Sequence, residues 1–359
     1  DSLTQRTSRG VVLFFLILLI SMVVGWHNTH SLPQVVFGAW VLTPFFFGLT
    51  TAPLLLKVDR LVFWVMVGMF VMAAGGTVVN SFVDYPWVGL SYSVGGVELE
   101  GAREWYVEGG NRRLSGLARS SFDVAGQVLV AAALMALQMK RGWARFVIWG
   151  LAGAAISLST SKGILLAMLM TACSVEAVRM QSVRGMVFIL SVGFVWLFLP
   201  PVMGWTMDWS EAARTDLENP LYGSFIDRMN DMWPRAWELG TDHGLPPLGR
   251  GLGGIGVPVS IFEPELANAG DNLFVYCLVL LGVFAVPLFA AAAVALYRLC
   301  LKLDLESVRL SMVLAVAVMW YGGVSNILEH AFLAFACGLV TRVIVAELAG
   351  LPLGKTWTE

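Results

Sequence analysis

The sequence predicts an all-α polytopic membrane protein with about ten transmembrane helices and two sizeable external loops. Hydrophobic residues make up 57% of its 359 residues and charged residues only 13%, about half the charged fraction of average soluble proteins. The mean hydropathy is +0.74. Apolar runs close to the ~20 residues that cross a bilayer core as a helix recur along the whole chain.

Ten such runs are separated by polar or charged connections. The first, Val11–Gly25, resembles the apolar part of a signal peptide, but no Ala-x-Ala-like cleavage site follows it, so we expect a spanning helix. The expected spans cover residues 11–27, 35–56, 61–82, 121–138, 144–158, 163–179, 185–205, 272–298, 308–326 and 330–349. The chain then divides into spans 1–3 (1–82), a loop (83–120), spans 4–7 (121–205), a larger loop (206–271), and spans 8–10 with a cytoplasmic tail (272–359).

Basic residues in the connections predict the orientation, because lysine and arginine are enriched in the cytoplasmic loops of membrane proteins. With ten spans, nearly all basic short connections fall on one side, and the short loops opposite carry only Lys162. We therefore expect both termini in the cytoplasm and segments 83–120 and 206–271 outside. The cytoplasmic basic residues are Arg6, Arg9, Lys57, Arg60, Lys140, Arg141, Arg145, Arg179, Arg184, Arg298, Lys302, Arg309 and Lys355.

Composition argues against two other classes of protein. The net charge is -2, and the chain has neither a basic tract nor a module of stacking aromatic residues, so no nucleic-acid partner is expected. The four cysteines lie in apolar runs without the spacing of metal ligands, so neither a disulfide nor a zinc site is expected. They are Cys173, Cys277, Cys300 and Cys337.

The first external loop shows a hairpin pattern and then a group of arginines. Residues 90–94 and 97–100 alternate around Gly95-Gly96, which predicts a two-residue β-hairpin, with Trp105 and Tyr106 available to pack on one face. Three arginines then precede the fourth span. They either anchor the helix at the interface or form a guanidinium cluster for an anionic ligand. The arginines are Arg112, Arg113 and Arg119.

Lys162 is a charge in a very short external loop between two apolar spans. A charge at this depth usually has a partner or a function. Contact with lipid phosphate is the alternative.

The second external loop begins with a predicted amphipathic helix. From Ser224, apolar residues recur at spacings of three and four, which predicts a helix at the membrane interface with a kink at Pro234. Arg228 and Arg235 are seven residues apart and are expected to share a face. Pairing of these arginines with Asp227 and Asp231 is the alternative. The apolar positions are Phe225, Met229, Met232, Trp233 and Trp237.

A glycine-rich turn and an Asp-Asn pair complete this loop. The turn contains a formal GxGxxG at residues 251–256, but no strand precedes it, so a dinucleotide site is not expected. We expect instead that Arg250 and the amides around Gly251 and Gly253 form a nest for an anion. Asp271 and Asn272 open the eighth span, where Asp271 is either the helix N-cap or a carboxylate facing the arginines.

In their order along the chain, these motifs resemble the O-antigen polymerase and O-antigen ligase superfamily over roughly residues 110–285. Ligases of that superfamily carry His-Asn where this chain has Asp271-Asn272, which favours a polymerase. Many members have Arg where Lys162 stands, and lysine keeps the charge without the bidentate geometry. The motifs are Arg113–Gly116, Ser161–Gly163, Arg228 with Trp233, Leu248–Gly253, and Asp271–Val275 with Gly282.

The resemblance implies a GT-C-like membrane glycosyltransferase, specifically a polysaccharide polymerase. Such an enzyme transfers a glycan from an undecaprenyl-diphosphate-linked donor to a lipid-linked acceptor repeat unit, at the periplasmic face of the bacterial inner membrane. The expected partners are this lipid-linked oligosaccharide, the lipid bilayer and a chain-length regulator protein. No Asp-x-Asp motif occurs, so no metal cofactor is expected.

Within this reaction the diphosphate leaving group develops negative charge, so fixed cations are expected around it. Arg228 and Arg250 are expected to be catalytic in this sense, and Asp271 is expected to take the proton of the acceptor hydroxyl. The alternative bases are Glu263, Glu265 and His243. The residues expected to bind substrate are Arg113, Lys162, Arg235, Asn272, Gly251 and Gly253.

The competing interpretations are an O-antigen ligase that transfers the glycan to lipid A core, another lipid-carrier glycosyltransferase, a transporter of lipid-linked oligosaccharide and a structural scaffold. A transporter predicts charges in mid-membrane and inverted repeats. The charges of this chain concentrate in the external loops instead. A scaffold would not require Arg, Gly and Asp residues gathered near one external surface.

Overall fold

The structure is a computed structural model that describes residues 2–55, 60–94, 97–106, 112–159, 162–211 and 223–351. It is mostly helical, as the sequence predicts, and each of the ten apolar runs forms helix over most of its length. The helices of the first half are α1 (Ser2–Thr29), α2 (Leu32–Val41), α3 (Thr43–Leu55), α4 (Arg60–Asn80), α5 (Ser121–Gln138), α6 (Gly142–Leu158), α7 (Lys162–Arg179) and α8 (Val183–Thr206).

The second half adds short helices outside the apolar runs and ends with three long helical segments. The short elements are α10 (Gly223–Asp227), the π-helix η1 (Arg228–Met232), α11 (Trp233–Thr241), α12 (Val257–Phe262) and the 3-10 turn η2 (Pro264–Leu266). The long segments are α13 (Leu273–Leu281) with η3 (Gly282–Phe284) and α14 (Ala285–Cys300), then α15 (Glu306–Gly322), and, after η4 (Ile327–Glu329), α16 (Ala331–Leu348).

Among the described residues, six helices are long and apolar enough to cross a membrane by length and composition. Two more, Leu16–Thr29 and Gly142–Leu158, are apolar but shorter. Of the remaining expected spans, α7 carries three charged residues and α15 has 17 residues. The six are Leu32–Pro53, Arg60–Asn80, Ser121–Gln138, Val183–Thr206, Leu273–Cys300 and Ala331–Leu348.

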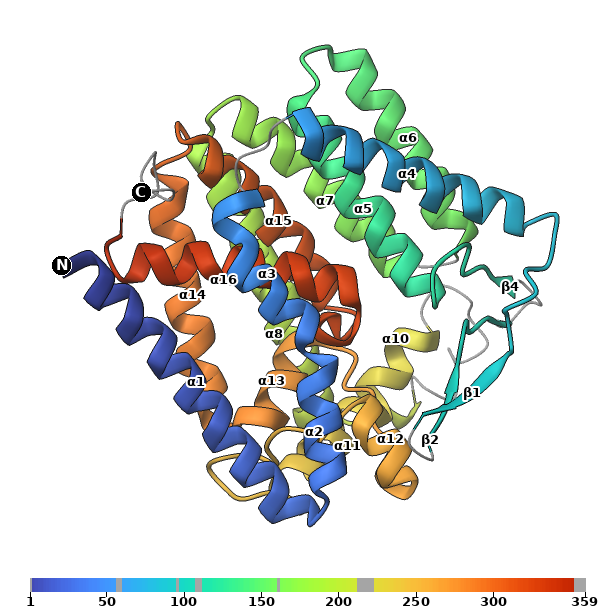
Figure 1. Ribbon diagram of the computed structural model, residues 1–359, viewed down its shortest axis with the longest axis vertical. Coiled ribbons are helices and arrows are strands. Elements are labelled where there is room, and N and C mark those ends of the chain that lie inside the picture. Colours follow the sequence, from blue (N-terminus) through green and yellow to red (C-terminus); the bar gives the residue numbers. More distant parts are fainter. Residues whose placement is uncertain are drawn as a thin grey trace.

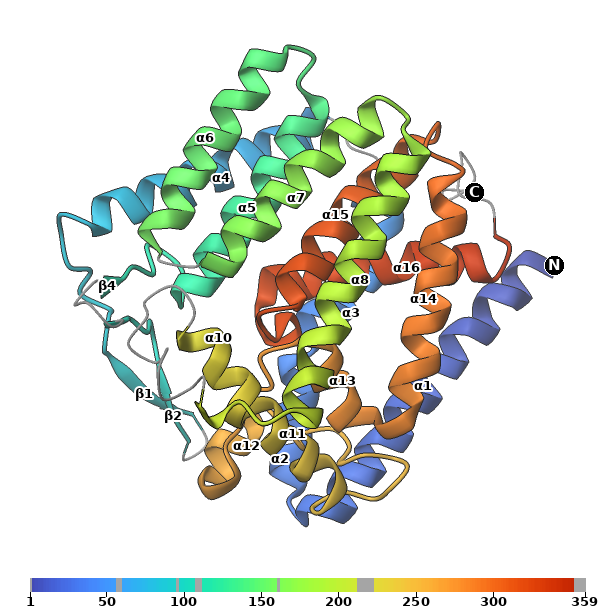
Figure 2. The ribbon, with the colours of Figure 1, turned by 180° about the vertical axis from the view of Figure 1, so that it is seen from behind.

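The core is built around α15, which is buried on all faces from Leu310 to Gly322. A helix that is apolar all round is expected at the centre of a bundle, and α5, α7, α8 and α16 pack against α15. Figure 1 shows α16 crossing the other helices obliquely, with its C-terminal end near the start of α1. The strands and α10–α12 lie together on the opposite side, and Figure 2 shows the same arrangement from behind.

The loop before α5, residues 83–120, contains the predicted hairpin. Strand β1 (Ser91–Val94) pairs antiparallel with β2 (Val97–Glu100), with Val94 opposite Val97, which confirms the prediction; Gly95 and Gly96 lie outside the described residues. Trp105 and Tyr106 form a separate strand, β3, which pairs with β4 (Arg112–Arg113). The β3–β4 pair therefore places Arg112 and Arg113 beside the residues that follow the hairpin.

Small residues allow α3 and α16 to pack closely. A Cβ atom on Gly338 would overlap the Phe45 carbonyl oxygen, and one on Gly48 would overlap the Phe335 carbonyl oxygen. Close backbone contact at glycines is a common way for membrane helices to associate. In contrast, a Cβ atom on Gly150, on the exposed face of α6, would contact nothing within 4 Å.

Gly338→Ala should destabilise the protein by about 1–3 kcal/mol, because the helices must separate to accommodate the methyl group. Gly150→Ala is the matched control, and it should leave stability unchanged or raise it slightly, since alanine is the better helix former. Thermal unfolding of the purified variants in detergent measures both effects. Equal unfolding temperatures for the two variants would contradict the packing described here.

Candidate active site

The predicted amphipathic helix forms, but a π-helix divides it. Pro234 has no amide hydrogen for an α-helical bond to the carbonyl of residue 230, and the Trp233 amide bonds instead to the Arg228 carbonyl, five residues back. A wider turn changes which side chains align. Arg235 is half-exposed and pairs with Asp231 at 3.3 Å, as the alternative interpretation held for this residue, whereas Arg228 pairs with neither Asp227 nor Asp231.

Arg228 makes an ion pair with Asp271, which is 43 residues away in the chain. Its Nη2 and Nε atoms donate to Asp271 Oδ2 at 2.8 and 3.2 Å, and Nη1 donates to the Ser224 carbonyl at 2.8 Å. The side chains are 14% and 21% exposed, respectively. The pair is therefore largely shielded from solvent but open on one side. This places two of the three expected catalytic residues in contact.

The position of Asp271 is set by its neighbour Asn272, which is the N-cap of α13. The Asn272 Oδ1 atom accepts hydrogen bonds from the Phe274 and Val275 amides, and Nδ2 donates to the Leu197 and Gly323 carbonyls. Asn272 is fully buried and uses both polar atoms structurally. Its expected substrate contact finds no support in this geometry. The N-cap interpretation of Asp271 is wrong, since Asn272 occupies that position.

Arg113 reaches the same group of charges from strand β4, in the loop before α5. Its guanidinium lies 5.5 Å from the centre of the Phe122 ring. Burial and the nearby Arg228 charge lower the pKa of Arg113, and the Asp271 carboxylate opposes this change. Arg113, Arg228 and Asp271 therefore lie within electrostatic reach of one another. The neighbouring Arg112 instead pairs with Asp84 and Glu104.

A histidine that sequence reasoning missed lies beside this group. His330 Nδ1 is 3.0 Å from Asp123 Oδ1, and His330 Nε2 is 3.0 Å from Ser325 Oγ. Burial opposes the charged imidazolium, but the hydrogen bond and charge of Asp123, with the charges of Asp271 and Glu329, raise the pKa of His330. The available signal was Asp123 itself, since an ionisable residue inside an apolar span indicates a functional site.

Glu329 is a second carboxyl group near Asp271. Its Oε1 atom accepts hydrogen bonds from the Val257 amide at 2.9 Å and the Tyr276 hydroxyl at 3.2 Å. Burial raises the pKa of Glu329 to about 7, against the effects of the Val257 bond, the His330 charge and the Tyr276 bond. Glu329 is therefore a buried carboxyl group within electrostatic reach of Asp271, with both the Val257 amide and the Tyr276 hydroxyl as hydrogen-bond partners.

In Figures 1 and 2, α10 lies next to the near ends of α5 and α7 and the turn between α15 and α16. This arrangement explains how residues from distant segments meet. Lys162, the first residue of α7, is exposed, and a Cβ atom on its neighbour Gly163 would meet Val324. Lys162 thus lies near the turn that holds Ser325, at the edge of the site.

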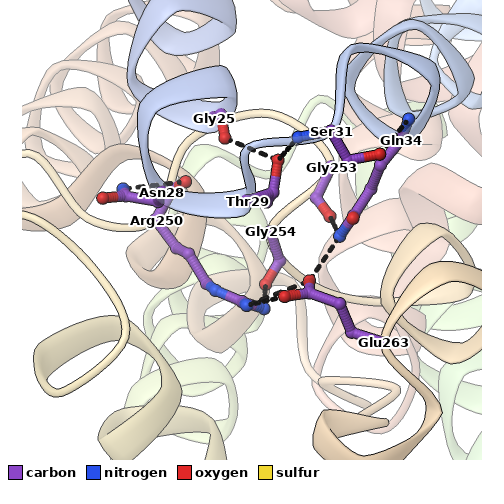
Figure 3. Close-up of polar contacts among 9 residues, drawn as sticks. All are labelled: Gly25, Asn28, Thr29, Ser31, Gln34, Arg250, Gly253, Gly254 and Glu263. Atoms are coloured by element: carbon purple, nitrogen blue, oxygen red, sulfur yellow. Dashed lines mark hydrogen bonds and ion pairs between the residues drawn. The ribbon is translucent and has the colours of Figure 1, made fainter.

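Arg250 has a different position from the one expected. Only 1% of it is exposed; its Nη2 contacts the Glu263 carboxylate at 2.8 and 3.0 Å, and Nη1 donates to the Gly254 carbonyl at 3.0 Å. Gln34 Nε2 donates to the same carboxylate at 2.6 Å and to the Gly253 carbonyl (Figure 3). Arg250 therefore connects the turn to α2 and α12, and the structure does not bring it to the Arg228–Asp271 pair.

The glycine turn is buried, and its amides already have protein partners. Gly251 and Gly253 have φ of +77° and +82°, and added Cβ atoms would overlap the backbone of α1 and α2. Figure 3 shows Asn28, at the end of α1, against this turn, where its Nδ2 donates to the Gly249 and Arg250 carbonyls. The amides of residues 250, 251, 252, 254 and 256 all donate to backbone carbonyls. The expected anion nest is therefore wrong for these five amides.

The alternative bases lie elsewhere. Glu263 is the partner of Arg250, and both Glu265 and His243 are exposed on the surface. Among the described residues, no group of three or more His, Cys, Asp or Glu side chains is arranged to hold a metal ion.

An apolar cavity of about 230 Å³ adjoins the arginine helix. It lies between the C-terminal half of α8 and the α10–η1 segment, and the residues on both sides of Arg228 contribute to its wall. The same short helical segment therefore carries Arg228 and part of the cavity wall, although Arg228 itself does not line the cavity. The cavity is lined by Leu199, Pro200, Met203, Trp209, Phe225, Ile226 and Met229.

No protein-family model matches this chain, and no curated protein and no solved structure matches it either.

Arg250→Ala should lower the free energy of unfolding by about 3–5 kcal/mol, because it leaves the Glu263 carboxylate without its buried partner. Arg235→Ala removes an exposed pair and should change it by less than about 0.5 kcal/mol. Denaturant unfolding in detergent measures both values. An Arg250→Ala variant as stable as the unmutated protein would show that the Arg250–Glu263 contact is not structural.

Proposed function

We propose that this protein is a membrane glycosyltransferase of the polysaccharide polymerase type. In this proposal it transfers a glycan from an undecaprenyl-diphosphate-linked donor to a lipid-linked acceptor repeat unit. The observation that carries the proposal is the Arg228–Asp271 pair, with Arg113 nearby, on a helical segment whose neighbouring residues line an apolar cavity. A ligand with a diphosphate head and a long apolar tail fits both halves of this site.

The arginines supply what departure of a diphosphate requires. As the anomeric carbon–oxygen bond breaks, the electron pair moves to the diphosphate, and fixed cations stabilise that charge most strongly where water is excluded. Guanidinium groups bind phosphate oxygens in a bidentate manner. Asp271 holds the Arg228 side chain in position through two contacts to one oxygen, so the cation is oriented before the ligand arrives.

The cavity supplies a place for the first isoprene units of the carrier. Phe225, Ile226 and Met229 line it and flank Arg228 in the chain. Binding of the tail and binding of the head are therefore coupled through one short helical segment. A soluble sugar nucleotide would leave the cavity unused.

The number of spans, their orientation and the type of membrane are part of this proposal. We infer ten spans in a GT-C-like arrangement in the bacterial inner membrane, with both termini cytoplasmic and the site at the periplasmic face. The gathering of β1–β4 and α10–α12 on one side of the molecule supports this orientation, since these are the segments that charge patterning predicts to be outside. A chain-length regulator would act as an additional partner.

Arg228→Ala should reduce glycan transfer by about 100-fold or more, because removing one group that stabilises developing charge typically has an effect of this size. The assay uses purified protein in liposomes with its undecaprenyl-diphosphate-linked repeat unit, in the presence of chelator. Arg103→Ala, which removes a largely exposed arginine of the first external loop, should leave the product ladder unchanged.

Each other result of this assay favours a different function. A single transfer to lipid A core would indicate a ligase, and movement of the donor between leaflets without transfer would indicate a transporter. Activity that disappears in chelator would contradict metal independence.

Leu199→Trp should fill part of the cavity and raise KM for the lipid-linked donor, with less effect on kcat. Val195→Trp, on an exposed face of the same helix, is the control for adding an indole to α8. Steady-state kinetics over a range of donor concentrations separates the two parameters. Identical KM values in both variants would show that the cavity does not bind the lipid.

A further inference from the structure

We propose that His330 is the catalytic base of the transfer reaction, held in position by Asp123. This inference rests on the proposed function and assigns the proton-transfer step, which was expected at Asp271, to a different residue. His330 immediately precedes α16, and Asp123 lies in the first turn of α5. The two segments are 207 residues apart in the chain.

The imidazole ring is fixed from several sides. Asp123 Oδ1 contacts Nδ1, and the Ser120 hydroxyl donates to Asp123 Oδ2 at 2.7 Å, so the carboxylate is itself oriented. The Phe122 and Tyr321 rings lie with their centres 5.8 and 6.1 Å from the imidazole. A base held in one orientation by a carboxylate is the arrangement that general base catalysis requires.

The hydrogen-bond partners determine which nitrogen accepts the proton. An ionised Asp123 only accepts hydrogen bonds, so Nδ1 of the neutral ring carries the hydrogen and Nε2 has the lone pair. In this tautomer the Ser325 hydroxyl, whose Oγ atom lies 3.0 Å from Nε2, is the donor. The His330 side chain is 18% exposed, and the proposed step requires a substrate hydroxyl to take the place of the Ser325 hydroxyl at Nε2.

The chemical step balances without any further reagent. The acceptor hydroxyl transfers its proton to His330 Nε2 while its oxygen forms a bond to the anomeric carbon of the donor. The bond between that carbon and the diphosphate oxygen breaks, and its electron pair leaves with the undecaprenyl diphosphate, beside Arg228. The imidazolium then releases its proton to water, and the ring returns to the neutral form.

The other carboxyl groups near the arginines are already engaged. Asp271 Oδ2 accepts both contacts from Arg228, and Glu329 Oε1 accepts hydrogen bonds from Val257 and Tyr276. Each therefore has a defined structural partner. His330 lies within electrostatic reach of Asp271, so the base and the leaving-group cations lie in one site.

The charges around His330 determine the pH dependence. The titratable groups that face it are Asp123 from α5, Asp271 before α13, Tyr321 from α15 and the adjacent Glu329. Burial opposes the charged imidazolium, but the hydrogen bond and charge of Asp123 and the charges of Asp271 and Glu329 raise the pKa of His330 above 6.5. Below that pKa the ring is protonated and cannot act as a base, so activity should rise with pH through a value above 6.5.

The test separates donor binding from transfer in the full-length protein in liposomes. His330→Gln should lower kcat by about 100-fold or more, the usual size of a general-base contribution, without changing the affinity for undecaprenyl diphosphate. Asp123→Asn should lower kcat less and move the acidic limb of the pH profile to lower pH, because the charge that raises the His330 pKa is gone. His27→Gln, an exposed histidine at the end of α1, is the control and should match the unmutated protein.

Each outcome decides the inference. A His330→Gln variant that transfers glycan at the unmutated rate overturns the assignment of the base and leaves the proposed function standing. If that variant does not fold, Asp123→Asn decides instead: an unshifted acidic limb overturns the inference, and a shift to lower pH supports it. If the unmutated protein binds undecaprenyl diphosphate but transfers nothing, the proposed function fails and this inference fails with it.

Discussion

The buried side chain of Asn272 is the constraint on which the centre of this structure depends. Four hydrogen bonds from one amide group cap α13, reach the Leu197 carbonyl in α8 and reach the Gly323 carbonyl at the end of α15. These three helices are apolar, and hydrogen bonds between their side chains are few. The hydrogen bonds of the Asn272 amide therefore fix where the ends of the helices meet. Because Asn272 takes the cap, the carboxylate of Asp271, one residue earlier, remains free to orient Arg228.

A second contact fixes the surrounding loop. The ion pair of Arg250 with Glu263, joined by Gln34, fastens the glycine turn to the connection between α1 and α2. The turn needs glycine because positive φ and close backbone packing coincide there. The Arg250–Glu263 ion pair thus holds the glycine turn, which lies in the segment that leads to Asp271.

Much of the fold could be predicted from the sequence, because apolar run length and turn chemistry are local properties. The helical runs, the hairpin at residues 91–100 and the helix after Ser224 all follow from such patterns. The site could be predicted only in part. Arg228, Asp271 and Arg113 come together as expected, but Arg235 pairs with the exposed Asp231 and the buried Arg250 pairs with Glu263. The His330–Asp123 contact joins segments 207 residues apart, and no local pattern encodes it.

The most direct test of the account is the affinity of the purified protein for undecaprenyl diphosphate compared with undecaprenol, which has the same tail and no phosphate. If the site at Arg228 binds a diphosphate head beside an apolar tail, Arg228→Gln should weaken binding of the diphosphate by about tenfold or more, the usual loss of a charge-assisted contact of ~1.5–3 kcal/mol, and leave binding of the alcohol unchanged. Equal losses for both ligands, or no loss for either, would contradict the assignment of Arg228 to the diphosphate.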